Sequence, residues 1–246
     1  MRRASSIIHA EGEAEFLAKA NLGPRIYNLF DPGGYLLWRL YPKYRVMTDS
    51  RSFPYLSWFD DQYRFSMGDS FEEFLQRYPA DVAVIDIVHV ATWRHFLKSP
   101  DWRPVFYGPT SAVFLKNTVS YDQPLTASVS NLRNAATALR LFRFEAELGD
   151  MPAAWTTLDY VESALSHQAD RAELTDARAY RDGYRALKAG DWPRARSLFD
   201  EAFRDSEPGE RDSTIRKYLV ALAAASATGS KEKIEASRAA LAQFVR

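Results

Sequence analysis

A nearly continuous apolar run at residues 82–88 constrains the fold of this chain more than any other feature. The run reads Val-Ala-Val-Ile-Asp-Ile-Val, so a strand formed here is apolar on both faces. Such strands are typical of parallel sheets, in which crossover helices cover both faces of the sheet. The run therefore predicts a sheet that lies between two layers of helices.

Short β-rich runs alternate with helical segments around this strand. Further strands are expected at residues 25–29, 44–49, 105–107 and 112–115, and helices at residues 35–40, 71–78 and 91–98. The sequence Gly-Pro-Thr-Ser at 108–111 predicts the turn of a closing hairpin. Strands that alternate with helices predict right-handed βαβ units. We expect residues 1–120 to form a small three-layer α/β domain with a mostly parallel sheet and an antiparallel edge.

The second half, residues 121–246, has a different character. It holds 12 of the 34 aromatic residues and is rich in Ala, Leu, Arg and Glu, which favour helix. A glycine followed by a helix start recurs at Gly149, Gly190 and Gly229, at spacings of 41 and 39 residues. This recurrence predicts an all-α domain of stacked helical hairpins.

The middle hairpin has the clearest pattern. Gly190 can adopt the left-handed conformation that ends a helix, and Asp191 can cap the next one. Ala195 and Ala202 are small enough for two helices to approach closely, and Phe199 can fill the groove between them. The pattern resembles the tetratricopeptide repeat, which implies a concave surface that binds a peptide or protein. A plain helical bundle without a binding role is the alternative.

Charge and composition exclude several classes of function. Lys and Arg number 32, as do Asp and Glu, and the two kinds of charge are nearly balanced in each half, so we expect no nucleic-acid partner. The absence of cysteine excludes disulfides, thiolate metal sites and a cysteine nucleophile. The four histidines are scattered, and no phosphate-loop or nucleophile-elbow motif is present. We therefore expect no cofactor, no metal and no catalytic residues.

The segments at residues 27–51 and 80–107 resemble the soluble C-terminal region of bacterial membrane proteins of the GT-C glycosyltransferase type. The resemblance rests on Asn-Leu-Phe-Asp-Pro-Gly-Gly-Tyr-Leu at 28–36 and on Asp-Ser-Arg at 49–51, where the family usually has Gly in place of Ser50. It implies an extracytoplasmic, periplasmic accessory domain, joined to the membrane only through spanning segments outside this sequence. A cytoplasmic location is the alternative.

The candidate ligand site lies where the first two expected strands end, because open α/β sheets bind ligands beyond the carboxyl ends of their strands. Carboxylates, an arginine and aromatic rings are the usual means of holding a sugar, so a glycan is the candidate ligand. We expect a loop at residues 52–63 to cover the site. The expected ligand-binding residues are Asp31, Asp49, Arg51, Tyr55, Trp58, Asp61 and Tyr63. Alternatively, Arg51 forms an ion pair with Asp49 that holds the loop, and the aromatic rings are buried.

Three functions follow from these features. The first is a non-catalytic accessory domain of a membrane glycosyltransferase-like protein that binds a glycan, an acceptor or a partner protein. The second is a free-standing tetratricopeptide-type adaptor that binds a peptide or protein. The third is a small hydrolase or transferase that uses Asp49 and its neighbours.

Overall fold

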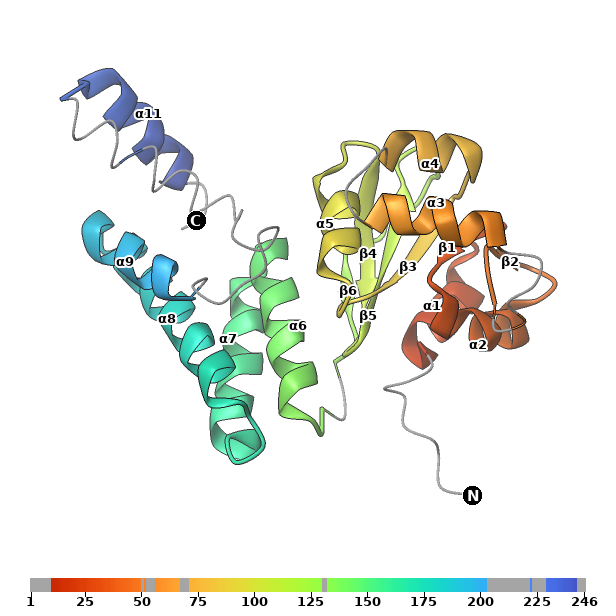
Figure 1. The fold of residues 1–246 in the computed structure, drawn as a ribbon, viewed down its shortest axis with the longest axis horizontal. Coiled ribbons are helices and arrows are strands. Elements are labelled where there is room, and N and C mark those ends of the chain that lie inside the picture. The colour runs from red at the N-terminus through yellow and green to blue at the C-terminus, as the bar shows by residue number, and fades with distance from the viewer. Residues whose placement is uncertain are drawn as a thin grey trace. The chain divides into compact units, whose positions relative to one another are not determined.

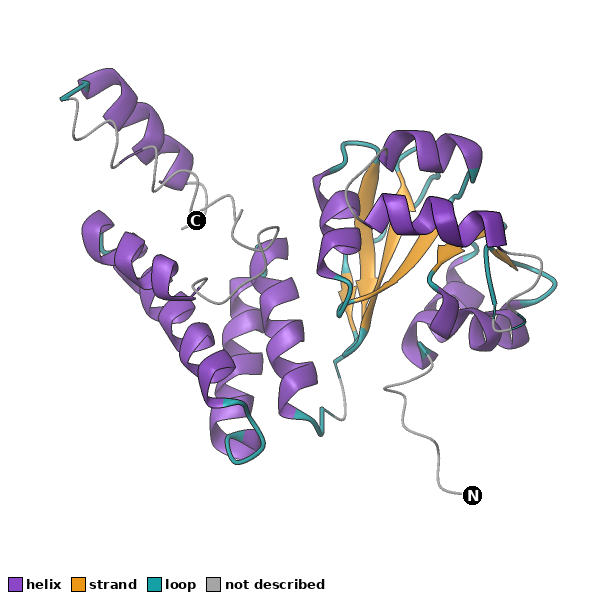
Figure 2. Cartoon of the chain, viewed as in Figure 1, coloured by secondary structure: helices purple, strands orange, loops and turns teal. Residues whose placement is uncertain are grey.

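The computed structural model describes residues 10–49, 51, 56–66, 71–129, 132–202, 222 and 229–242. The chain divides into two compact units, with the division between Leu132 and Arg133. Figures 1 and 2 show an α/β unit followed by a helical unit.

The first unit alternates helices and strands from its start. Its elements are α1 (Glu11–Ala20), β1 (Arg25–Asn28), α2 (Phe30–Leu40), β2 (Arg45–Val46), α3 (Leu56–Ser66), α4 (Phe71–Arg77), β3 (Val82–Asp86), α5 (Val90–Lys98), β4 (Trp102–Tyr107), β5 (Ser111–Lys116) and β6 (Thr126–Ala127). The strands form a six-stranded sheet in the order β2-β1-β3-β5-β4-β6. The pairs β1–β2, β1–β3 and β4–β6 are parallel, whereas β5 is antiparallel to both β3 and β4. The predicted mixed α/β architecture, with a mostly parallel sheet and a closing hairpin, is confirmed.

One face of the sheet is covered by α1 and α2 (Figure 1) and has an aliphatic core. Leu17 of α1 and Leu36 of α2 are fully buried against Ile26, Val82 and Val84. Because side chains alternate along a strand, these three strand residues belong to the same face. Burial of aliphatic surface therefore holds both helices on this face, where α1 contacts β4 and β5 and α2 contacts β2.

The opposite face carries an aromatic core under α4 and α5. The ring of Tyr27 lies 5.7 Å from that of Phe74 and 5.4 Å from that of Phe96, measured between centroids. Phe96 also contacts Trp102 at 4.9 Å and Phe114 at 5.6 Å. Edge and tilted contacts of this kind add to the stabilisation from buried area.

Two local expectations in this unit are wrong. The helix expected at residues 35–40 starts earlier, at Phe30, so the sequence Asp-Pro-Gly-Gly at 31–34 lies within the first turns of α2. Pro32 is tolerated there because the first residues of a helix have no intrahelical partner for their N–H groups. The expected loop at residues 52–63 is also replaced, from Leu56 onward, by helix α3. Residues 52–55 lie outside the described part of the chain.

The helical unit contains α6 (Ala135–Leu148), α7 (Met151–Tyr160), a π-helical turn η1 (Val161–Leu165), α8 (Arg171–Lys188), α9 (Trp192–Ala202) and α11 (Lys231–Ala242). Gly149 and Gly190 adopt left-handed conformations, with φ of 87° and 75°, and end α6 and α8. The next residue caps the following helix in both hairpins: Asp150 accepts from the N–H of Ala153, and Asp191 from that of Arg194, each at 3.2 Å. The helix ends expected at Gly149 and Gly190 and the cap expected from Asp191 are therefore confirmed.

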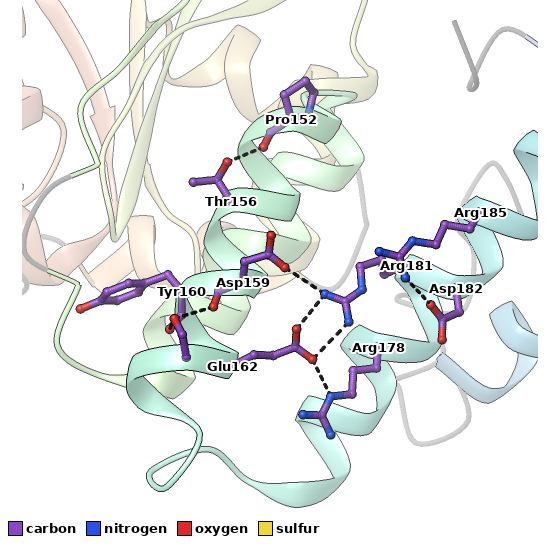
Figure 3. A network of polar contacts seen from close by, with 10 residues as sticks. Pro152, Thr156, Asp159, Tyr160, Glu162, Arg178, Arg181, Asp182 and Arg185 are labelled. Atoms are coloured by element: carbon purple, nitrogen blue, oxygen red, sulfur yellow. Dashed lines mark hydrogen bonds and ion pairs between the residues drawn. The ribbon is translucent and has the colours of Figure 1, made fainter.

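A polar network ties η1 to α8 (Figure 3). The carboxylate of Glu162 accepts from Arg178 at 2.7 Å and from Arg181 at 2.8 Å, and Asp159 accepts from Arg181 at 3.1 Å. The hydrogen bond from Arg181, together with that from Arg178, holds the pKa of Glu162 below its usual value, although burial opposes the shift. The wider turn of a π-helix changes the direction of the side chains that follow it. Because Asp159 and Glu162 follow α6 in the first hairpin and both arginines belong to α8 in the second, the network links the two hairpins.

The junction between the units lies later than composition alone suggests. Strand β6 pairs with β4, so residues up to 127 belong to the sheet of the first unit. The composition changes near residue 120 because the chain there is a polar connection, not because the first unit ends. We find no strand at the described positions after residue 130.

Candidate functional site

Three aspartates lie at one edge of the parallel strands. Asp31 and Asp49 each follow their strands, β1 and β2, by three residues, and Asp86 is the last residue of β3. Because these strands run in the same direction, their carboxyl ends meet at one edge of the sheet. From β1 the chain passes through α2 to β2, on one side of β1, and later returns as β3 on the other side of β1. The position between the ends of β1 and β3 is therefore the switch point, where open sheets bind ligands.

Buried hydrogen bonds hold this edge together. The Nδ2 group of Asn28 donates to the carbonyl oxygens of Leu29 and Thr48, both at 2.8 Å, and its Oδ1 accepts from the N–H of Met47 at 2.9 Å. Asn28 is fully buried, so all three bonds are protected from water. They fix the end of β1 to the end of β2 and thereby set the positions of the residues that follow.

The carboxyl group of Glu13, from α1, lies at the turn between β4 and β5. Glu13 is only 2% exposed, and its Oε1 has no hydrogen-bond partner within the described part of the chain. A Cβ on Gly108 would lie 2.5 Å from this oxygen, so only glycine leaves room for the carboxyl group. An unpaired buried polar atom is costly and rare in folded proteins, which marks Glu13 as a functional candidate.

Burial raises the pKa of Glu13 from 4.5 to about 7. The backbone N–H of Glu13 itself lowers the pKa in part, the charge of Asp86 raises it, and the N–H of Gly108 lowers it. Glu13 therefore changes its protonation near neutral pH. Groups whose environment shifts their pKa in this way are concentrated at functional sites.

Asp86 connects Glu13 to the more exposed Asp31. Burial raises the pKa of Asp86; its hydrogen bond from Ser111, at 2.9 Å, and the charge of His89 lower it, and the charge of Asp31 raises it further. Asp31 is exposed at the start of α2. The carboxyl groups of Glu13, Asp86 and Asp31, which we call the carboxyl cluster, thus extend from the buried turn to the surface.

Asp49 and Arg51 form a bidentate ion pair beside the carboxyl cluster. Oδ1 of Asp49 accepts from Nε of Arg51 at 2.8 Å and from its backbone N–H at 3.0 Å, and Oδ2 accepts from Nη2. The side chain of Asp49 is 2% exposed, whereas that of Arg51 is 70% exposed. Asp49 and Arg51 therefore lie at the expected edge of the sheet. They form the ion pair that was the alternative to ligand binding.

The other expected site residues have different positions. Trp58 is buried on α3, with its ring 6.4 Å from that of Phe74 between centroids. Asp61 accepts from Arg77 at 2.8 Å and from the hydroxyl of Tyr78 at 2.6 Å, which ties α3 to the end of α4. Tyr63 is exposed on α3, and Tyr55 lies outside the described residues. The structure thus gives Trp58 and Asp61 packing and pairing contacts within the α3–α4 layer.

Glu13 and Asp86 are not among the site residues expected from the sequence. Ala10, Ala14 and Leu17 line the buried side of α1, and Glu13 lies in the same stripe. A lone acidic residue within an apolar helical stripe was the available signal. Asp86 closes the apolar run of β3, where a strand covered on both faces does not ordinarily carry a charge.

A pH-dependent stability test addresses Glu13 directly. The folded state binds more protons than the unfolded state between pH 4.5 and about 7, so this group makes the protein less stable as the pH rises through that window. Glu13→Gln removes the titration. We expect the free energy of unfolding of the variant, minus that of the parent, to be greater at pH 8 than at pH 4.5 by on the order of 3 kcal/mol. Urea unfolding at several pH values measures this difference.

The control for this test is Glu15→Gln, which changes an exposed carboxylate on the same helix. Its unfolding free energy should follow that of the parent across the pH range. Parallel pH profiles for Glu13→Gln and the parent would show that Glu13 is not buried as an acid in the folded protein.

Within the described ranges, no group of three His, Asp or Glu side chains is arranged to hold a metal ion. No protein-family model, curated protein or solved structure matches the chain. The resemblance to glycosyltransferase-associated domains therefore stays a prediction. Among the helices of the described part, none combines the length and the apolar composition needed to cross a membrane.

Proposed function

We propose that this chain is a binding module whose α/β unit holds a hydroxyl-rich ligand, a glycan, at the carboxyl cluster. The observation that carries the proposal is the buried carboxyl group of Glu13, with an unpaired oxygen, beside Asp86 at the switch point of the sheet. A polar atom left without a partner in such a place is suited to a role in ligand binding.

The charge of the cluster favours this class of ligand. Carboxylates accept hydrogen bonds from hydroxyl groups, and a protonated Glu13 can donate one as well. Asp31 lies in the first turn of α2, so a carboxylate already occupies the end of that helix where a phosphate would bind. A neutral or aminated sugar fits these charges, whereas a nucleotide or phosphate does not.

The biological setting of the proposal comes from the sequence resemblance. In this setting the chain is an extracytoplasmic accessory domain of a membrane glycosyltransferase-like protein, on the periplasmic side, and is not itself catalytic. Asp49 uses both of its carboxylate oxygens to bind Arg51, which disfavours the hydrolase or transferase alternative in which Asp49 is the reacting group.

We further propose that the helical unit belongs to the tetratricopeptide type and binds a peptide or protein. The support is the repeated connection in which Gly149 and Gly190 are left-handed and Asp150 and Asp191 cap the following helices. Stacked hairpins of this kind present a concave surface to a partner. A free-standing adaptor would use the same surface.

The direct test of the glycan proposal is a glycan array probed with the intact chain. We expect binding to neutral or aminated sugars, and Asp31→Asn or Asp86→Asn should weaken it about tenfold or more, the effect of one lost charge-assisted hydrogen bond. The thermal melts of both variants should stay close to that of the parent. Asp31 is exposed, and the amide oxygen that Asp86→Asn introduces can still accept from Ser111.

Asp101→Asn provides the matched control, since it makes the same change at an exposed carboxylate before β4. It should bind as the parent does. A folded parent chain that binds no glycan, or variants that bind as well as the parent, would overturn the proposal. Binding confined to phosphorylated ligands would overturn the assigned ligand class.

A further inference from the structure

Two aromatic side chains are exposed at the end of α2. Trp38 is 73% exposed and Tyr41 is 70% exposed, the largest values among the bulky hydrophobic residues of the described chain. The ring of Tyr35 lies 5.8 Å from that of Trp38, and the guanidinium of Arg39 lies 5.7 Å from the centre of the Trp38 ring. Tyr35 packs against the core, so Trp38 extends outward from a fixed base.

Four exposed basic side chains lie at the same edge of the sheet as these rings. Lys19 ends α1, Arg39 ends α2, Lys43 follows Tyr41, and Arg45 begins β2. Because each helix ends where the next strand begins, all four residues lie at the amino edge of the parallel strands, opposite the carboxyl cluster. The Nζ group of Lys43 donates to the carbonyl oxygen of Ala18 at 2.7 Å, which joins the end of α1 to the end of α2.

Few acidic groups offset this charge. Residues 16–48 contain five Lys or Arg and a single acidic residue, Asp31, which lies at the opposite edge. Asp81, at the start of β3, is paired with Arg25, with 2.7 Å between its Oδ1 and Nη2 of the arginine. Glu11 and Glu15 are the exposed or half-buried carboxylates of α1, and the charges of both act on Tyr35, so they offset part of the four basic charges. The amino edge therefore carries a net positive charge.

We propose that this amino edge docks on the surface of an anionic lipid bilayer. The amphipathic rings of tryptophan and tyrosine favour the level of the lipid headgroups, and lysine and arginine are attracted to anionic lipids. Sugars are held mainly by carboxylate and amide groups beside a ring. The group beside the Trp38 ring is instead the guanidinium of Arg39, so the observations favour a membrane. This docking turns the carboxyl cluster away from the bilayer, and it does not depend on the identity of the ligand bound there.

Vesicle flotation with the intact chain tests the proposal. The probes are vesicles of phosphatidylcholine alone and vesicles with equal parts of phosphatidylcholine and phosphatidylglycerol. The parent should bind the anionic vesicles at low ionic strength and should be released by salt. The double variant Trp38→Ala/Tyr41→Ala and the charge variant Lys19→Glu/Arg45→Glu should each reduce binding by roughly tenfold or more.

Tyr160→Ala, which removes an exposed ring from the helical unit, is the control and should bind as the parent does. Thermal melts will establish that the variants are folded, as expected for changes at exposed side chains. A parent that ignores anionic vesicles, or a double variant that binds like the parent, would overturn the proposal. It would also be overturned if Trp38→Ala/Tyr41→Ala abolished binding to neutral sugars without changing binding to vesicles, because the rings would then form a glycan platform.

Discussion

Replacing Gly33 by alanine is expected to destabilise the α/β unit by at least about 3 kcal/mol, the upper end of the usual cost of overpacking. A Cβ at this position would lie 2.0 Å from the carbonyl oxygen of Thr48 and 2.7 Å from Nδ2 of Asn28. Both neighbours are fully buried, and one of them is backbone, so neither can rotate away. Helix α2 would have to move off the end of β2, and the hydrogen bonds of Asn28 would be lost. Urea unfolding monitored by circular dichroism measures the loss.

Gly12→Ala makes the same change within α1 and is the matched control. The Cβ there would meet only the ring of Phe106, at 3.4 Å, which is an ordinary contact. Alanine favours helix over glycine, so this variant should be as stable as the parent or more stable, by up to about 1 kcal/mol. If both alanine variants unfolded at the parent's urea concentration, α2 would not approach β2 as closely as described.

Phe199→Ala should cost the helical unit about 3–5 kcal/mol, the usual effect of removing a large core aromatic. Phe199 of α9 is fully buried, and its ring lies 5.1 Å from that of Tyr180 on α8 in an edge contact. Its ring atoms also lie 3.2 Å from where a Cβ on Gly183 would be, so the two helices are packed directly through this side chain. Thermal unfolding should show the loss in the transition of the helical unit.

Trp192→Ala serves as the comparison for Phe199→Ala. Trp192 is the first residue of α9 and is only half-buried. Its removal should therefore cost less than that of Phe199. The opposite order of melting temperatures would show that the hairpin packs through the tryptophan instead.

The sequence predicts this fold best where a local pattern determines the structure. The apolar run of β3, the hairpin turn at 108–111 and the left-handed glycines each depend on residues close together in the chain. Helix α3 was mistaken for a loop because only two of its described side chains are buried, Trp58 and Gln62, and one of these two is polar. Tertiary contacts, such as the hydrogen bond from Tyr27 to Gln62 at 2.7 Å, stabilise what the local pattern does not indicate.

The candidate site was partly predictable for the same reason. Asp31 and Asp49 could be placed at one edge because parallel strands bring their carboxyl ends together. The position of Glu13 could not be predicted, since it depends on how α1 packs against Gly108, which is 95 residues away in the sequence. Contacts between distant segments of this kind leave no periodic pattern in the sequence.

The short strand β6 has a practical consequence for dividing the chain. Phe106 and Tyr107 pair with Thr126 and Ala127, and the N–H of Ser128 donates to the carbonyl oxygen of Tyr107 at 2.9 Å. These bonds cover part of β4, whose backbone would otherwise be open to pairing with a second molecule. A truncation at residue 120 would remove this protection and favour aggregation through the uncovered edge. The α/β unit should therefore be produced alone only with residues up to Ser128 retained.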